Sequence, residues 1–323
     1  MTVRLAILDD YQSLALRLAD WTLVRTRCEI KVFTRHLGED AAAEQLRDYD
    51  IVCLLRERMA FPRALIERLP RLKFIATTGA STRTLDLSAA SERGIMVSRT
   101  VRRGSGGLAT AELAWGLILA LVRHIPQEAT RMRQGGWQTT IGTALGGRTL
   151  GVLGLGRLGR SMVPIAKAFG MNVIAWSQNM TPAAATEAGA LYVSKDELFA
   201  RSDVVSLHLV LSERTRHIVG EAELSRMRPD AYLVNTARGP LVDKAALLRA
   251  LRDSSIAGAA LDTFDIEPLP EDDPLRRLDN VILTPHLGYT VRELLQPFYE
   301  DTVENVLAFL DGMPLRTVTA DAR

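Results

Sequence analysis

Short apolar runs alternate along the chain with longer segments in which apolar residues recur at helical spacing. This alternation is typical of βαβ units, which build parallel sheets. The short runs are mainly apolar, with an occasional charged residue. In the first third of the chain these predict strands at Val3–Leu8, Ile51–Leu55, Leu72–Thr77 and Ile95–Val97, and the spacing predicts a helix at Arg63–Leu69.

The pattern changes at residues 99–107, which are polar, basic and rich in glycine. Such clusters interrupt regular structure, so we expect a hinge between two domains here. A long helix is predicted next, over Ala109–His124, and a second βα series begins at Thr149. This series contains six predicted strands, which is the number in a complete dinucleotide-binding domain. They are Leu150–Leu153, Val173–Trp176, Val204–Leu207, Ala231–Asn235, Ile256–Leu261 and Val281–Thr284.

The last predicted helix covers Val291–Leu310, with Pro297 as a kink and Gly312 just past its end. We expect this helix to cross back and pack on the first domain. The first domain would then comprise residues 1–100 and 291–323, and the second residues 101–290. A length of 323 residues fits two domains of about 150 residues each.

Composition narrows the class of protein. Apolar residues make up 47% and charged residues 24%, which excludes collagen-like, disordered and disulfide-stapled chains. The net charge of +2 is spread along the chain and argues against a nucleic-acid partner. The most apolar stretch, Leu113–Val122, has half of the about 20 residues that a bilayer span needs. Cys28 and Cys53 have no zinc-ligand spacing and are interpreted as reduced core thiols. With no signal-peptide pattern, we expect a cytoplasmic protein without a metal or a membrane partner.

One glycine motif predicts a cofactor. Gly154, Gly156 and Gly159 match G-x-G-x-x-G between a predicted strand and an amphipathic helical segment, the context that gives the motif its meaning. The first glycine permits a tight turn, the second lets the backbone approach a pyrophosphate, and the third lets helix and strand pack closely. The motif therefore predicts NAD or NADP, with a purely structural turn as the alternative. Pro164 removes one backbone donor from the helix that follows.

The residue expected to contact the ribose is unusual. Strand Val173–Trp176 ends in Ser177, where such domains usually carry an Asp or Glu for the ribose hydroxyls. Neither a carboxylate nor a cationic side chain is found at Ser177, Gln178 or Asn179. We therefore expect weak discrimination between NAD and NADP, or a preference for NADP.

Three complementary polar residues follow three predicted strands. His286 supplies an acid for the alkoxide that forms when a carbonyl is reduced. Glu267 beside a histidine would favour the imidazolium and fix the ring. Arg238 offers a planar fork for a substrate carboxylate and polarises a neighbouring carbonyl. Ligands bind beyond the carboxyl ends of parallel strands, so we expect the three together. His208 also follows a strand, and is either the rival acid or a residue that lines the cofactor site.

Four motifs, taken in order, make the chain resemble the D-isomer-specific 2-hydroxyacid dehydrogenases over essentially its whole length. They are Gly154–Gly159, Asn235–Gly239, Leu261–Pro268 and Thr284–Gly288. Pattern and resemblance together predict an α/β protein with two doubly wound parallel-sheet domains, a Rossmann cofactor domain being inserted into a smaller flavodoxin-like substrate domain. The resemblance implies hydride transfer between a nicotinamide cofactor and a 2-keto or D-2-hydroxy acid in the cleft between the domains. The hinges for domain closure would lie at 99–107 and 287–290.

The resemblance also implies residue roles. Arg238 would bind the substrate carboxylate, and Glu267 would assist His286 as the acid/base. Besides the motif glycines and Ser177, the residues with implied cofactor contacts are Arg157, Leu158, Thr236, Ala237 and Asp262, with Asp262 near the nicotinamide amide. The loop Thr77–Ala80 resembles the family's backbone clamp for the carboxylate, so Gly79 and Ala80 are implied substrate contacts. Arg56 matches a position that contacts substrate in some members, with a solvated loop as the alternative.

Some departures from the family leave the substrate's side chain open. Ser81, Arg83 and Thr84 replace the usual glycine and Asp-Asn, and Val210 replaces a common proline. Formate dehydrogenase is disfavoured, because its members have glutamine where this chain has Glu267. A homodimer is implied, and we expect the helix Ala109–His124 at its interface. The alternative to an enzyme is a cofactor-sensing scaffold without turnover, like the corepressors that resemble this family.

Overall fold

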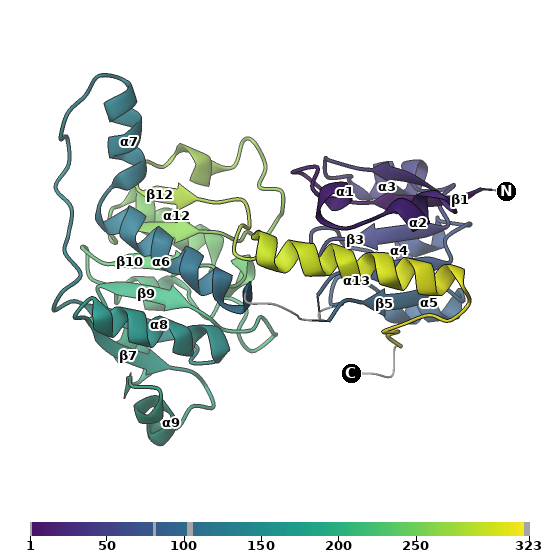
Figure 1. Cartoon of the computed structure of the whole chain (residues 1–323). Coiled ribbons are helices and arrows are strands. Elements are labelled where there is room, and N and C mark those ends of the chain that lie inside the picture. The colour runs from purple at the N-terminus through teal and green to yellow at the C-terminus, as the bar shows by residue number, and fades with distance from the viewer. Residues whose placement is uncertain (1, 80–81, 102–105, 320–323) are drawn as a thin grey trace. The chain divides into compact units, whose positions relative to one another are not determined.

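The computed structural model describes residues 2–79, 82–101 and 106–319. The chain divides into two compact units. Unit 1 is formed by residues up to Gly106 and from Val291 onward, and unit 2 by Gly107–Thr290. Each unit is built on a parallel sheet, of five strands in unit 1 and seven in unit 2 (Figure 1). The two parallel-sheet α/β domains predicted from the sequence are thereby confirmed.

Unit 1 has the strand order β2-β1-β3-β4-β5, which is the flavodoxin-like order. Its strands are β1 Val3–Ile7, β2 Cys28–Val32, β3 Ile51–Leu54, β4 Phe74–Thr77 and β5 Met96–Arg99. Its helices are α1 Ala15–Leu18, α2 Thr22–Arg25, α3 Glu39–Gln45, α4 Arg63–Glu67, α5 Leu87–Glu92 and α13 Arg292–Leu310. Helix α13, yellow in Figure 1, packs on α1, α2, β4 and β5, and its Phe309 ring stacks on Phe74 with centroids 4.4 Å apart.

The strand β2 was missed by the sequence analysis. Its sequence, Cys-Glu-Ile-Lys-Val, alternates between apolar and charged residues because β2 lies at the edge of the sheet, with Glu29 and Lys31 exposed. A mainly apolar run marks a strand that is covered on both faces, so the alternating residues of an edge strand give a weaker signal.

Unit 2 contains all six strands that the sequence predicted and one more. The strands are β6 Thr149–Leu153, β7 Asn172–Trp176, β8 Leu191–Tyr192, β9 Val204–Leu207, β10 Tyr232–Asn235, β11 Gly258–Leu261 and β12 Val281–Leu283. Their order, β12-β11-β10-β9-β6-β7-β8, contains the Rossmann order with β8 as its third strand. The two-residue β8 was too short to be recognised from sequence. The strand β12, counted above as the sixth of the Rossmann set, is an additional strand beside β11.

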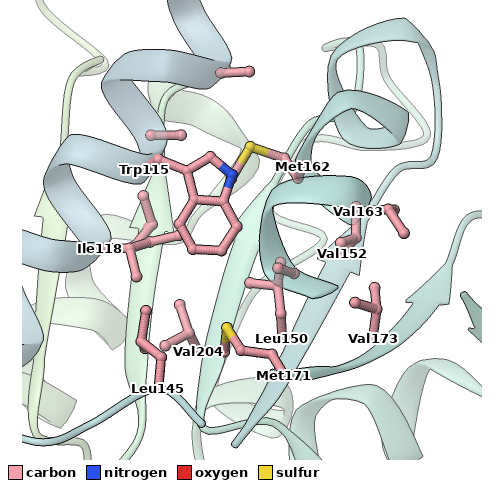
Figure 2. Close-up of a cluster of buried hydrophobic side chains, with 14 of the residues drawn as sticks. Trp115, Ile118, Leu145, Leu150, Val152, Met162, Val163, Met171, Val173 and Val204 are labelled. Atoms are coloured by element: carbon pink, nitrogen blue, oxygen red, sulfur yellow. The ribbon is translucent and has the colours of Figure 1, made fainter. Parts of the chain in front are cut away.

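Helices cover both faces of the sheet in unit 2. They are α6 Ala109–Val122, α7 Ile125–Arg133, α8 Arg157–Ala168, α9 Pro182–Glu187, α10 Lys195–Arg201, α11 Glu221–Leu224 and α12 Lys244–Arg252, with 3₁₀ turns at Gly106–Leu108, Gly239–Leu241 and Pro274–Arg277. On one face, α6 packs on α8, β10 and β11, and the ring of its Trp115 lies beside Met162 of α8 (Figure 2). On the other face, α10 and α12 bury Phe199 and Leu247. Burial on both faces explains the apolar runs along the central strands.

None of the helices in the described part of the chain has the length and apolar composition that a bilayer crossing requires. Cys28 and Cys53 are both buried as free thiols. Within the described ranges, no group of three or more His, Cys, Asp or Glu side chains is placed to hold a metal ion.

Candidate active site

The glycine turn after β6 has the geometry that a dinucleotide requires. Gly154 has a φ of +103°, and a Cβ there would lie 2.9 Å from the backbone of His208 and Leu209. At Gly159 a Cβ would lie 2.0 Å from the Gly154 carbonyl oxygen, so α8 packs closely on the turn. At Gly156, which directly precedes α8, a Cβ would meet nothing within 4 Å. The first and third glycines are thus needed for close packing, and the second leaves open space for a pyrophosphate beside a helix start.

Ser177 lies beside this turn. Leu153 and Trp176 are partners in the β6–β7 ladder, and the Gly154 N–H donates to the Trp176 carbonyl oxygen at 2.8 Å. Ser177, the next residue, is half-buried. Arg157 begins α8 next to the turn, and its guanidinium donates to the carbonyl oxygen of Gly107.

The loop after β10 carries Arg238 and is held by Asn235. The Asn235 side-chain amide donates to the Arg238 carbonyl oxygen at 2.8 Å, and its Oδ1 accepts the Ala237 N–H at 3.0 Å. Thr236 Oγ1 is buried without a hydrogen-bond partner among the described residues, which fits a residue that a cofactor contacts. A Cβ at Gly239 would lie 2.2 Å from the backbone of Phe264, so this loop touches the loop that carries Glu267.

Glu267 and His286 form the pair that the sequence predicted. His286 Nδ1 lies 2.7 Å from Glu267 Oε2, while Oε1 of the same carboxylate accepts the Phe264 N–H at 2.9 Å. The Glu267 side chain is 28% exposed and the His286 side chain is 23% exposed. The Tyr289 ring packs edge-on against His286, with centroids 5.3 Å apart. One oxygen of the Glu267 carboxylate is fixed by a backbone N–H, and the other orients the imidazole through Nδ1. Nε2 is therefore the ring nitrogen that is left to exchange a proton with a substrate.

Asp262 holds the loop that carries His286. It is fully buried, and its Oδ1 accepts the Thr284 hydroxyl at 2.6 Å and the Leu287 N–H at 2.7 Å. Its Oδ2 accepts the Gly288 N–H at 2.9 Å. Burial raises the pKa of Asp262, although these bonds and the nearby His286 act in the opposite direction. From the sequence, Asp262 was expected only to contact the cofactor, so this anchoring role is new. An aspartate directly after a buried strand was the available signal.

His208 is less suited than His286 to act as the acid near neutral pH. Burial lowers its pKa to about 4, so the ring is neutral at physiological pH. Its Nε2 lies 2.9 Å from Ser206 Oγ, and its backbone lies against Gly154. Of the two histidines that follow strands, His286 is therefore the one suited to protonate an alkoxide.

The three catalytic candidates leave the same edge of the sheet. The strands β10, β11 and β12 are parallel neighbours, and hydrogen bonds from Asp262 to Asn235 and from Thr284 to Leu261 continue both ladders past the strand ends. Arg238, Glu267 and His286 follow these ends, so one edge carries a cation and a carboxylate–imidazole pair. That combination can bind an anion and exchange a proton beside it.

In unit 1, the structure brings Arg56 and Gly79 together. A Cβ at Gly79, which has a φ of +83°, would lie 2.9 Å from Arg56 Nη1. The Gly79 N–H donates to the Thr100 hydroxyl at 2.8 Å, so it must leave that partner to contact a substrate anion. Ala80, the other predicted clamp residue, and Ser81 lie outside the described residues, as do residues 102–105 of the predicted hinge.

A Rossmann sheet with this glycine turn and this carboxylate–imidazole pair defines a nicotinamide-dependent dehydrogenase. Residues 115–288 match the model of the family described as D-isomer specific 2-hydroxyacid dehydrogenase, NAD binding domain. A glyoxylate reductase from Thermococcus litoralis is 38% identical over 289 residues, which cover 86% of each chain. A hydroxypyruvate reductase from Thermotoga maritima is 35% identical over 88% of this chain and 92% of its own. The solved structure of a phosphoglycerate oxidoreductase from Vibrio cholerae has a TM-score of 0.89 at 34% identity, covering 96% of this chain and 100% of that one.

The chain belongs to the D-isomer-specific 2-hydroxyacid dehydrogenase family. It is an oxidoreductase that transfers a hydride between a nicotinamide cofactor, NAD(P), and a 2-keto or D-2-hydroxy acid, as the sequence predicted. None of these comparisons supports the scaffold alternative.

Proposed function

We propose that the enzyme reduces small 2-keto acids, with Arg238 binding the substrate carboxylate and His286 supplying the proton. The observation that carries this proposal is the 2.7 Å contact between His286 Nδ1 and Glu267 Oε2. With Nδ1 held by the carboxylate, the ring is oriented so that a proton on Nε2 can be donated to the carbonyl oxygen as negative charge develops on it. In the reverse direction, neutral Nε2 accepts the proton of the hydroxyl group. Arg238 holds the carboxylate and polarises the carbonyl.

The nicotinamide, when bound, supplies or accepts the hydride at C2 of the substrate. We propose that the pyrophosphate is held by backbone at Gly154, Gly156 and Gly159 and at the start of α8, including Arg157 and Leu158. Ser177 would contact the ribose. Thr236, Ala237 and Asp262 are proposed as further cofactor contacts. Asp262 also accepts hydrogen bonds from the Thr284 hydroxyl and from the loop that carries His286. Because Ser177 supplies a hydroxyl in place of a carboxylate, we propose that NADPH is used at least as well as NADH.

The substrate class follows from the relatives. Two relatives are named for glyoxylate and hydroxypyruvate, and we propose 2-keto acids of this size for this enzyme. Arg56, Gly79 and Ala80 of unit 1 are proposed to contact the same substrate. Cys28 and Cys53, as buried free thiols, are consistent with the reducing cytoplasm that we propose as its location.

The experiment is a turnover assay with NADH and NADPH in parallel, over glyoxylate, hydroxypyruvate, pyruvate, phenylpyruvate and 2-ketoglutarate. We expect turnover of the smaller acids by the wild type. The variant His286→Gln should lose about 10³-fold in kcat, because it removes the proton donor, yet bind cofactor with unchanged affinity. His217→Gln, at an exposed histidine, is the matched control. Full activity in His286→Gln, or a wild type inactive on the whole panel, would contradict the proposal.

We also propose a homodimer. Helix α6, the predicted interface, buries eight residues, including Trp115 and Ile118, within the core of its own unit. We therefore place the interface on the arm formed by α7 and the segment after it, which projects from the rest of unit 2 in Figure 1. The arm exposes four large apolar residues to solvent. Their exposed fractions are 51% for Ile125, 57% for Met132, 71% for Trp137 and 94% for Ile141. A second copy of the chain is the occupant proposed for this surface.

A further inference from the structure

Arg56 is held in an unusual backbone conformation. Its φ is +57°, in the left-handed region that side chains other than glycine and asparagine seldom adopt. It lies in a turn directly after β3, which the Arg58 N–H closes by donating to the Leu55 carbonyl oxygen at 3.3 Å. The Arg56 N–H donates to the Thr78 hydroxyl at 2.8 Å. This conformation lays the guanidinium against Gly79, so the turn decides where the charge of Arg56 is presented.

Arg58 ties this turn to the end of the neighbouring strand. Its Nη1 donates to the carbonyl oxygen of Asp9 at 2.6 Å, and its guanidinium lies 4.7 Å from the centre of the Tyr11 ring. The two segments leave adjacent strands, since Ile7 of β1 pairs with Cys53 of β3 and the Leu8 N–H donates to the Cys53 carbonyl oxygen. A charge-assisted bond and a cation–π contact therefore connect the two turns.

The acceptor at Asp9 is itself fixed. Asp9 is buried, with a left-handed φ of +54°. Its Oδ1 accepts the Tyr11 hydroxyl at 3.1 Å and lies 3.2 Å from His36 Nδ1. The next residue, Asp10, accepts the Leu14 and Ala15 N–H groups at the start of α1, each at 2.9 Å. The Asp9 carbonyl oxygen is thus held in place, and the bond that Arg58 donates to it fixes the turn at residues 55–58.

We propose that Arg58 is a positioning residue that sets substrate affinity by holding Arg56 in its left-handed turn. The inference rests on the proposed function, in which Arg56 contacts the 2-keto acid. Without Arg58 the strained turn relaxes and the Arg56 guanidinium leaves its place over Gly79. Arg56 is charged before and after hydride transfer, so its contact strengthens ground-state and transition-state binding alike. The loss therefore raises KM for the keto acid and leaves kcat unchanged.

The first test is the variant Arg58→Met. We expect KM for the best keto acid to rise about tenfold, as loss of one charged contact does, with kcat and KM for the cofactor unchanged. Arg58→Lys keeps a donor and a cation over Tyr11, and should recover part of the loss. Arg63→Met is the matched control, since Arg63 is a surface arginine of the same unit that pairs with Glu92. If Arg58→Met fails to fold, Tyr11→Leu serves as a second variant. Tyr11 is 40% exposed, and its loss removes the ring contact to Arg58, so KM for the keto acid should rise.

The second test separates positioning from general loosening of unit 1. In an Arg56→Met background, Arg58→Met should have no further effect on KM, because its action passes through Arg56. Equal multiplicative effects in the two backgrounds would overturn the inference, as would a wild-type KM in Arg58→Met. Absence of turnover by the wild type would instead contradict the proposed function, so the two failures are distinguishable.

Discussion

At the scale of single residues, three histidines of this chain show how surroundings set a role. His286 is oriented by Glu267 and lies half-buried at the end of β12. His208 also follows a strand, but burial lowers its pKa to about 4 and removes it from acid chemistry near neutrality. His36 is paired with Asp9, and the hydrogen bond to that carboxylate raises its pKa above the ordinary value. The strand-end positions were visible in the sequence, whereas these charge states depend on packing.

His36 gives a prediction about stability and pH. Its pKa in the folded protein lies above the unfolded value of about 6.5, so protonation favours the folded state. This stabilisation is fully present below the unfolded pKa and is lost as the pH rises through the folded pKa. His36→Gln keeps a polar side chain without the charge. We expect it to be less stable than the wild type by roughly 1 kcal/mol at acidic pH, with the difference vanishing at alkaline pH. Urea unfolding at about pH 5.5 and about pH 8.5 measures this, and an equal difference at both would refute it.

At the scale of elements, the site is built where three neighbouring strands end. The loops after β10 and β11 touch through Gly239 and Phe264, and Asp262 at the end of β11 binds the loop after β12. Each loop is thus fixed by a residue of an adjacent one. Short hydrogen bonds across strand ends therefore position the loops of Arg238, Glu267 and His286, the residues that we propose as catalytic.

Asp262→Asn tests this arrangement. The change replaces one acceptor oxygen with a donor, so the N–H groups of Leu287 and Gly288 and the Thr284 hydroxyl are no longer all satisfied. We expect kcat to fall by about 10- to 100-fold through displacement of His286, with a small effect on KM for the substrate. Asp243→Asn is the control, since Asp243 caps α12 and asparagine caps equally well. Steady-state kinetics of both variants measure this. A kcat of Asp262→Asn equal to that of the wild type would show that Asp262 does not position His286.

At the scale of the whole molecule, two parallel sheets are formed from one chain that leaves unit 1 and returns to it with α13. Unit 2 carries the glycine turn and the Glu267–His286 pair, and unit 1 carries Arg56 and Gly79. The arm of unit 2 exposes four large apolar side chains in a single copy, and we propose that they are covered in a dimer.

The arm yields a prediction about assembly. We expect the wild type to have twice the 35.6 kDa mass of one chain in solution. Trp137→Ser combined with Ile141→Ser should shift the mass towards that of a monomer, because buried interface area is lost. Leu23→Ser, at a residue 64% exposed on α2 of unit 1, should leave the mass unchanged. Size-exclusion chromatography with light scattering measures all three, and a monomeric wild type would refute the dimer.

The sequence by itself determined the parallel α/β class, the central strands, the glycine turn and the family, because these depend on local signals. A strand covered on both faces is mostly apolar, and a backbone with a φ of +103° at Gly154 favours glycine. Tertiary structure decided what depends on residues distant in sequence. It made β2 and β8 strands at the sheet edges, set the charge state of His208, and turned Asp262 into an anchor for the His286 loop. It also joined Asp9, His36 and Arg58, because only folding brings the ends of neighbouring strands together.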